Sequence, residues 1–134
     1  MSKKNAKRIC FVTIASDGTL EDVEPIRASP GTTVLFVLSN EHPTDDIKVE
    51  IADFKRRETM TAANPIATGG PHRRTLSPGE VESLKLMLHP KARFGDPGAG
   101  LLPYTTYKYS VLVTNATAGS ATVTYDPDLD VPPA

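Results

Sequence analysis

The chain has 134 residues, of which 39% are hydrophobic, and its 15 basic and 16 acidic side chains leave a formal net charge of -1. This length fits one domain with a single core, because a chain of this size buries roughly two-thirds of its unfolded surface. The near-neutral charge gives no global attraction to nucleic acid or to an anionic membrane. No stretch approaches the ~20 apolar residues that cross a bilayer, so we expect neither nucleic acid nor a membrane as a partner.

The two ends of the chain carry opposite charges. Residues 1–7 are basic and polar, and the segment after them is too short and too polar for the apolar part of a signal peptide. The single cysteine, Cys10, cannot form an internal disulfide, so we expect a cytoplasmic protein with a flexible basic N-terminus. Residues 127–134 contain aspartate and proline and are expected to form an acidic tail outside the domain.

In chain order, short runs of β-branched and aromatic residues are separated by Gly, Pro, Asn or Asp, the pattern of β-strands. Residues 9–15 are apolar at both sets of alternate positions, which predicts a strand covered on both sides. Residues 33–39 are the most hydrophobic run and predict a buried central strand. With these two included, about seven segments follow the pattern: residues 9–15, 21–28, 33–39, 47–51, 81–88, 104–114 and 120–125.

The connections between these segments indicate how they are arranged. Residues 29–32 and 77–80 each place Pro directly before Gly, the order that a tight turn prefers. Strands do not alternate with helical patterns, so the sequence predicts an all-β fold, an antiparallel Greek-key β-sandwich over residues 8–126. Residues 55–77 have no clear period and predict a long loop within this domain.

Several framework residues follow the order found in one family of β-sandwich proteins. The first of them are Pro30, Gly31, Val34, Phe36 and Asn40. A second Pro-Gly-Glu turn, a Tyr-Lys-Tyr segment and a glycine before the last strand follow at residues 78–80, 107–109 and 119–123. In this order the chain resembles the cupredoxins over nearly the whole domain, which implies a copper-binding β-sandwich scaffold. The same turns occur in immunoglobulin-like sandwiches, which are the second fold expected.

The resemblance also implies where copper ligands would lie, and those side chains are missing. The first histidine would fall at Asp45 or Asp46, and the cysteine at Ser110 or Val111. The second histidine and the methionine would fall within residues 114–119, which contain no His, Cys or Met. A blue-copper site needs two imidazoles and a thiolate, so we expect a copper-free domain without a cofactor.

The three histidines are the remaining candidates for metal ligands. His42, His72 and His89 each lie beside a proline in a predicted loop. If the loops converged, two of them with Asp45 or Asp46 could hold zinc or Cu(II). Their scattered spacing favours solvent-facing residues instead. A metal-binding or redox protein with a rearranged histidine site is therefore the alternative function.

Basic residues on both sides of the long loop form a candidate partner-binding surface, called the basic patch below. Because the two ends of the loop are expected to meet, these side chains would lie together, and arginine binds carboxylates in bidentate geometry. An acidic protein segment would fit such a surface. The basic patch consists of Lys55, Arg56, Arg57, Arg73 and Arg74.

No sequence pattern indicates a catalytic centre. There is no G-x-S-x-G motif, and the glycine-rich residues 69–71 and 95–100 lack the G-K-S/T of a phosphate-binding loop. We therefore expect a non-enzymatic protein interaction or assembly module whose partner the sequence does not name. A homodimer is one such assembly, because an edge strand at residues 23–27 or 47–53 could pair with a second copy. A further alternative is a small-ligand binder or an enzyme with a pocket under residues 55–77.

Overall fold

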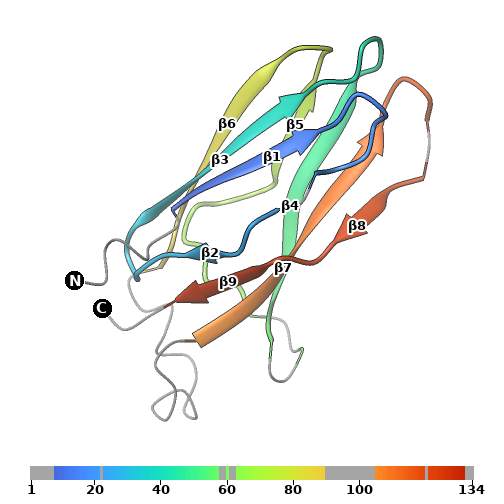
Figure 1. Cartoon of the computed structure of the whole chain (residues 1–134). Coiled ribbons are helices and arrows are strands. Elements are labelled where there is room, and N and C mark those ends of the chain that lie inside the picture. The colour runs from blue at the N-terminus through green and yellow to red at the C-terminus, as the bar shows by residue number, and fades with distance from the viewer. Residues whose placement is uncertain are drawn as a thin grey trace.

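The computed structural model of the chain describes residues 8–21, 23–57, 60, 63–89, 105–119 and 121–131 (Figure 1). Regular structure within these residues consists of strands, and no helix there is long and apolar enough to cross a membrane. The strands are β1 (Ile9–Ile14), β2 (Ile26–Arg27), β3 (Thr33–Asn40), β4 (Ile47–Arg56), β5 (His72–Leu76), β6 (Val81–Met87), β7 (Thr105–Asn115), β8 (Val123–Tyr125) and β9 (Asp128–Val131).

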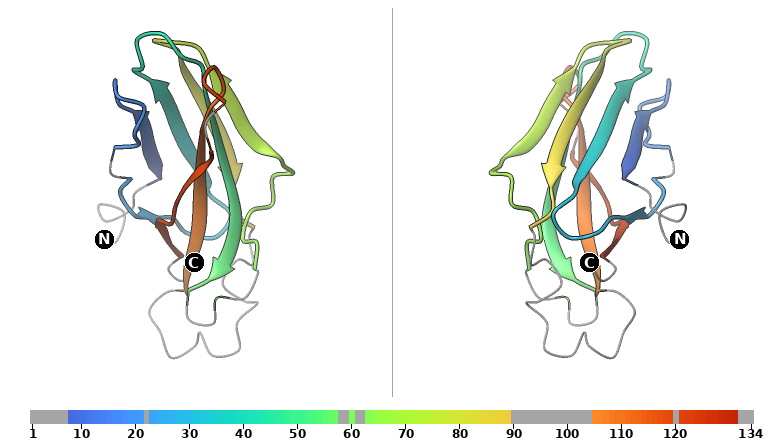
Figure 2. Two further views of the ribbon diagram at one scale, coloured as in Figure 1. Left: turned by 90° about the vertical axis from the view of Figure 1, so that its right-hand side faces the viewer. Right: turned by 90° about the vertical axis from the view of Figure 1, so that its left-hand side faces the viewer.

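The strands form two sheets that pack face to face, which confirms the predicted β-sandwich (Figure 2). The three-stranded sheet has the order β1-β3-β6, and the six-stranded sheet has the order β2-β9-β7-β4-β5. β8 and β9 follow one another along one side of β7, whose other side pairs with β4. The pairs β1–β3 and β2–β9 are parallel, so the sheets are mixed where the sequence predicts antiparallel pairing alone.

Two of the predicted turns are confirmed by the backbone. Gly31 and Gly79 have φ angles of 79° and 78°, in the left-handed region that favours glycine. In each turn the N–H of the fourth residue donates to the carbonyl of the first, at 3.3 Å and 2.9 Å respectively. Because these turns lie directly before β3 and β6, they determine where the two strands begin.

The core lies between the two sheets and is centred on aromatic rings. Tyr109 of β7 is fully buried, and its ring meets that of Phe36 edge-on at 5.8 Å and stacks on that of Phe54 at 5.6 Å. The Tyr109 hydroxyl lies 3.9 Å from the Sγ of Cys10 on β1. Burial raises the pKa of the Cys10 thiol to about 11, so this cysteine belongs to the core and stays protonated at neutral pH.

The structure corrects the predicted boundary of the domain at its C-terminal end. Part of the expected tail, residues 127–134, is strand β9, which pairs with both β7 and β2. Leu129 and Val131 alternate with aspartates and are buried, with 2% and 0% of their surface exposed. The domain therefore extends at least to residue 131. Residues 132–134 and the basic residues 1–7 lie outside the described part of the chain.

The structure also shortens the long loop expected at residues 55–77. β4 continues to Arg56 and β5 begins at His72. Between them, the segment around Ile66 lies along the end of β6, where Ile66 bridges Leu88 and the N–H of Ala67 donates to the carbonyl of Met87 at 2.8 Å. Part of the expected loop is thus attached to the three-stranded sheet. Residues 58, 59, 61 and 62 are not among the described residues.

Candidate functional site

His42 lies between β3 and β4, and hydrogen bonds engage its ring. Its Nδ1 accepts the backbone N–H of Thr44 at 3.2 Å and that of Asp45 at 3.0 Å. Because Nδ1 acts as an acceptor, the neutral ring carries its proton on Nε2, which lies 3.7 Å from Oδ2 of Asp45. A metal ion at Nδ1 would have to displace both backbone hydrogen bonds. His42 therefore organises this loop.

The other two candidate histidines lie elsewhere in the fold. β3 and β6 are antiparallel, so His42, which follows β3, and His89, which follows β6, lie at opposite ends of the three-stranded sheet. His72 begins β5 and pairs with Ile51 in the six-stranded sheet. Within the described ranges, no group of three or more His, Cys, Asp or Glu side chains is placed to hold a metal ion. The structure does not bring the three histidines together.

Two loops meet at the end of the sandwich where the resemblance places copper ligands. The Nδ2 of Asn115, the last residue of β7, donates to Oδ2 of Asp45 at 2.9 Å. Next to this contact, the N–H of Asp46 donates to Oγ1 of Thr117 at 2.8 Å. The structure thus brings together the candidate positions in the two loops. Their contact consists of hydrogen bonds between nitrogen and oxygen atoms.

Asn40 connects the loops at this end of the sandwich through its side-chain hydrogen bonds. It is the last residue of β3, only 1% of its surface is exposed, and its Nδ2 donates to the carbonyls of Asp45 and Leu76, both at 2.9 Å. Its Oδ1 accepts the N–H of His42 at 2.9 Å. The third candidate ligand position, Ser110, is buried in the middle of β7, away from the loops at the end of that strand.

The contact between Asp45 and Asn115 predicts a measurable pH effect. Hydrogen bonds from Asn115 and then Thr44 hold the pKa of the Asp45 carboxyl below its usual value. A lowered pKa in the folded state means that the contact stabilises the fold above the carboxyl's unfolded pKa, and that this contribution is lost as pH falls through the folded pKa. Asn115→Ala is expected to raise the Asp45 pKa toward the ordinary value of an aspartate, as measured by NMR titration of the carboxyl carbon. The carboxyl of Asp17, whose pKa Thr19 lowers, is the internal control, and an unchanged Asp45 would contradict the assignment.

The basic patch is divided by the register of the strands. Arg73 of β5 lies opposite Glu50 of β4. Lys55 lies further along β4, opposite Lys108 of β7, and the distance along the strand from Glu50 to Lys55 is about 16 Å. The basic residues at the end of β4 and those on β5 therefore occupy two separate places on the six-stranded sheet.

One arginine in each part of the basic patch lies beside a carboxylate. Arg57 and Lys108 lie 3.6 Å and 3.0 Å from the carboxylate of Asp128 on β9, in the segment expected to be an acidic tail. Arg74 lies 3.4 Å from Glu82 of the opposite sheet. Exposed pairs of this kind contribute at most about 1 kcal/mol each to stability, but they reduce the net positive charge at both places. The basic patch is thus two separate groups of basic side chains, each with one arginine paired to a carboxylate.

A depression of about 300 Å³ lies beside the end of β4, where the sequence allows a ligand pocket under residues 55–77. Its lining residues are Asp53, Phe54, Lys55 and Met60. Ligand pockets occupy about 300–1,000 Å³ and enclose most of their ligand, so this open site is at the lower limit. Its lining has one apolar ring, one carboxylate and one ammonium group, and it is open to solvent. This depression therefore gives little support to an enzyme or to a small-ligand binder.

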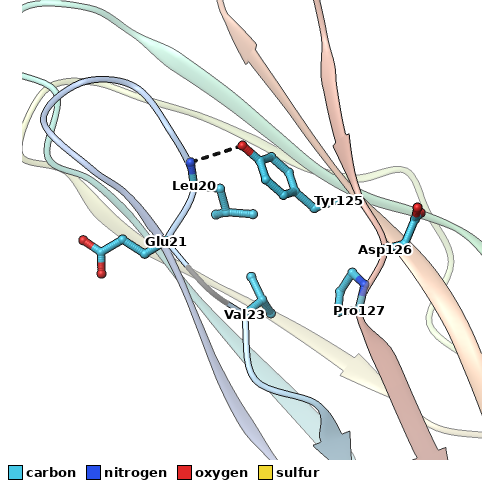
Figure 3. Close-up of a pocket in the computed structure, with 6 residues that line it drawn as sticks. All are labelled: Leu20, Glu21, Val23, Tyr125, Asp126 and Pro127. Atoms are coloured by element: carbon cyan, nitrogen blue, oxygen red, sulfur yellow. Dashed lines mark hydrogen bonds between the residues drawn. The ribbon is translucent and has the colours of Figure 1, made fainter.

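A second depression, of about 210 Å³, lies between the segment after β1 and the junction of β8 with β9 (Figure 3). The N–H of Leu20 donates to the hydroxyl of Tyr125 across it at 3.5 Å. Leu20 and Val23 face Pro127 and the Tyr125 ring, whereas the carboxylate of Glu21 points away from them (Figure 3). Its lining combines apolar residues with Glu21 and Asp126, and the depression is smaller than a usual ligand pocket.

The outer face of the three-stranded sheet is the least expected surface of the molecule. β3 is apolar on both faces, because Leu35 and Val37 alternate with the buried residues and point away from the core. Phe11 on β1 and Val81 on β6 are 65% and 61% exposed. The register places Phe11 beside Val37 and Ile9 beside Leu35. Val81 and Met87 lie at the two ends of β6, opposite Ser39 and Thr33, with polar Ser83 and Lys85 between them. The outer face, as defined here, consists of Ile9, Phe11, Leu35, Val37, Val81 and Met87.

The sequence predicts that this face is apolar, but it does not predict that the face is exposed. The apolar pattern on both sides of residues 9–15 predicts a strand covered on each side. The structure covers one side with the core, whereas no described residue covers Phe11 on the other side enough to bury it. The candidate site is therefore the outer face, whose side chains are apolar and which the described residues leave exposed.

Comparison with known proteins supports the fold alone. No protein-family model and no curated protein sequence matches the chain. Among solved structures, the ASH/PapD-like domain 7 of human CEP192 is similar with a TM-score of 0.50 and 16% identity, over 83% of this chain and 81% of that chain. Dithionite-reduced auracyanin from the photosynthetic bacterium Roseiflexus castenholzii gives a TM-score of 0.48 and 12% identity, over 96% of this chain and 99% of that chain. At these identities, the likeness to the CEP192 domain shows that the chain has a β-sandwich fold.

Proposed function

We propose that this domain is a non-enzymatic protein interaction or assembly module that binds a protein partner through the outer face. The exposed apolar side chains of that face carry the proposal, above all Phe11, which is 65% exposed. The largest exposed apolar patch of a soluble protein, typically a few hundred Å², is often a contact site for other molecules. Burying the ring of Phe11 and the aliphatic side chains beside it would provide the free energy of association.

The size and surroundings of the outer face fit the centre of a protein interface. Three strands about 4.8 Å apart, over about six residues each, give a surface of roughly 14 Å by 20 Å. The strands also place Thr13 and Ser39 in one row at its end and Lys85 beside Leu35 at its side. An apolar centre with a polar rim is the usual composition of an interface, and a complete one covers about 800 Å² on each partner.

The scaffold in this proposal is cupredoxin-like and copper-free. Its support is the framework order in the sequence, together with the meeting of the two loops at Asp45 and Asn115, where oxygen and nitrogen groups bond one another directly. Neither loop offers the thiolate that a blue-copper site requires. We also propose a cytoplasmic location, which suits a single cysteine held in the core as a thiol.

Val37→Lys tests the outer face, because it places a charge in the middle of the apolar surface. Val37 is half-buried between Phe11 and Ser83 on neighbouring strands, and a partner packed there would have to bury the new ammonium group. We expect a protein recovered by affinity capture with the wild type to bind this variant at least tenfold more weakly by calorimetry.

Val123→Lys is the matched control for this experiment. Val123 lies on β8 in the other sheet and is 51% exposed, so the same substitution adds the same charge far from the outer face. Partner affinity is expected to stay within twofold of the wild-type value. If both variants bind like the wild type, or if both lose binding equally, the outer face is not the interface.

A further inference from the structure

The outer face ends at a strand edge that differs from two other edges of the sandwich. β5 carries Arg73 and Arg74, and β6 carries Lys85 and is partly covered by the segment around Ile66. Charged side chains and covering segments are the usual means by which edges avoid pairing with another chain. β1 is the outermost strand of its sheet and has no charged side chain from residue 9 to residue 14 (Figure 2).

The hydrogen bonds of β1 show which of its backbone groups point outward. The N–H of Leu35 on β3 donates to the carbonyl of Arg8 at 2.8 Å, and Leu35 pairs in register with Ile9. In a parallel pair this arrangement directs the N–H and C=O groups of even-numbered residues of β1 toward β3 and those of odd-numbered residues away from it. Ile9, Phe11 and Thr13 therefore present their backbone groups to the free side of the strand.

One of these three residues is already engaged. The carbonyl of Thr13 accepts the N–H of Glu21 at 2.9 Å, because the chain turns back along β1 and bridges Ile14 with Leu20. No residue in the described ranges pairs with Ile9 or Phe11 on the free side. The open part of the edge is therefore short: it contains two residues whose N–H and C=O groups have no hydrogen-bond partner among the described residues.

We propose that a second copy of this chain occupies this edge, with the two β1 strands antiparallel and Ile9 of each copy opposite Phe11 of the other. A two-fold symmetric pair of identical strands has to be antiparallel. Setting Phe11 opposite Phe11 would place Ile9 opposite Thr13, whose carbonyl is occupied. The register with Ile9 opposite Phe11 matches each open residue with an open residue and forms about four backbone hydrogen bonds.

This pairing would also join the apolar side chains of the two copies. Ile9 lies beside Leu35, and Phe11 lies beside Val37, within each copy. With Ile9 opposite Phe11, a continuous apolar row crosses the symmetry axis, from Leu35 and Ile9 of one copy to Phe11 and Val37 of the other. Cross-strand contacts between aromatic and β-branched residues stabilise a sheet. The pairing would join the outer faces of the two copies into one surface of twice the size. This inference rests on the proposed assembly function.

Cysteine pairs test the register directly. In a Cys10→Ala background, which removes the native thiol, Ile9→Cys and Phe11→Cys are made as separate proteins. The proposed register sets residue 9 opposite residue 11 of the other copy at a Cα separation of about 5.5 Å, within reach of a disulfide. Two residues 9, or two residues 11, would be diagonal neighbours beyond the ~7 Å limit.

Mild oxidation is expected to cross-link the mixture of the two cysteine proteins into a dimer and to leave each protein alone mostly monomeric on a non-reducing gel. Equal cross-linking in all three samples would show random collision or another register, and would overturn the proposal. Failure of the mixture to cross-link would overturn it as well. Circular dichroism confirms that each variant keeps the strand content of the wild type.

The wild-type chain provides a measurement that needs no substitution. Its mass by sedimentation velocity is expected to rise toward that of a dimer as the concentration increases, and exchange of the Phe11 amide proton is expected to slow at the same time. Phe11→Pro should abolish this rise. Because the Phe11 N–H points away from β3, proline there removes no hydrogen bond within one copy, as is usual for an edge strand.

The outcomes separate this inference from the proposed function. Val37 lies on β3, inside the sheet, so Val37→Lys should weaken the partner complex and leave the β1 pairing in place. A wild-type chain that remains monomeric at every concentration, or that captures only an extended segment of another protein at β1, would overturn the second copy as the occupant. Binding at the outer face would be unaffected by that result.

Discussion

Replacing Tyr109 with alanine is expected to lower the free energy of unfolding by about 4 kcal/mol, the usual cost of removing a large aromatic side chain from a packed core. Tyr109 is fully buried on β7, and its ring contacts Phe36 of the facing sheet and Phe54 of β4. The substitution removes both ring contacts and leaves a cavity between the sheets. Because small domains are stable by only about 5–15 kcal/mol, urea titration should show a much lower midpoint with a similar slope.

Tyr109→Phe is the control, since it keeps the ring and removes only the hydroxyl. The hydroxyl lies 3.9 Å from the Sγ of Cys10, a long contact with a weak hydrogen-bonding partner. Its loss is expected to lower the free energy of unfolding by about 1 kcal/mol or less. Equal losses for the alanine and phenylalanine variants would show that ring packing is not what Tyr109 contributes.

The features that could be predicted from the sequence depend on short-range rules. A proline before Gly31 or Gly79 specifies a turn, because glycine alone adopts the required positive φ without strain. Alternation of apolar and charged residues within residues 47–51 indicates a strand, because successive side chains point to opposite faces of a sheet. Both patterns lie within a few residues, so neighbouring residues suffice to interpret them. The β-sandwich follows from the number and order of such segments.

The features that could not be predicted depend on the register between distant strands. The basic patch combines the end of β4 with β5, and whether Lys55 and Arg73 meet depends on which residues of the two strands pair. Registry is determined by the packing of whole sheets, and nothing near either residue in the sequence specifies it. The pairing of Arg57 with Asp128 likewise joins segments far apart in the chain.

The outer face shows that a correct pattern can have an incomplete interpretation. Apolar residues on both sides of residues 9–15 predict a strand that is covered on both sides. The structure buries Val12 and leaves Phe11 65% exposed, and in the proposed function a partner covers this second side. The sequence therefore indicates two apolar sides, and the structure shows which of them stays exposed among the described residues.

Leu129→Ala is expected to lower the free energy of unfolding by about 3 kcal/mol, a large effect for a residue that the sequence assigns to a tail. Leu129 is 2% exposed in β9 and pairs with Tyr107 on one side and Ile26 on the other, so its loss opens a cavity where three strands meet. This strand is difficult to predict from the sequence, because the alternation of apolar and polar residues in β9 covers only four residues. Val123→Ala, on the exposed face of β8, is expected to change stability by less than about 0.5 kcal/mol. The same small change for both variants in thermal and urea unfolding would show that residues 128–131 do not pack as a strand. The prediction of an acidic tail would then be correct.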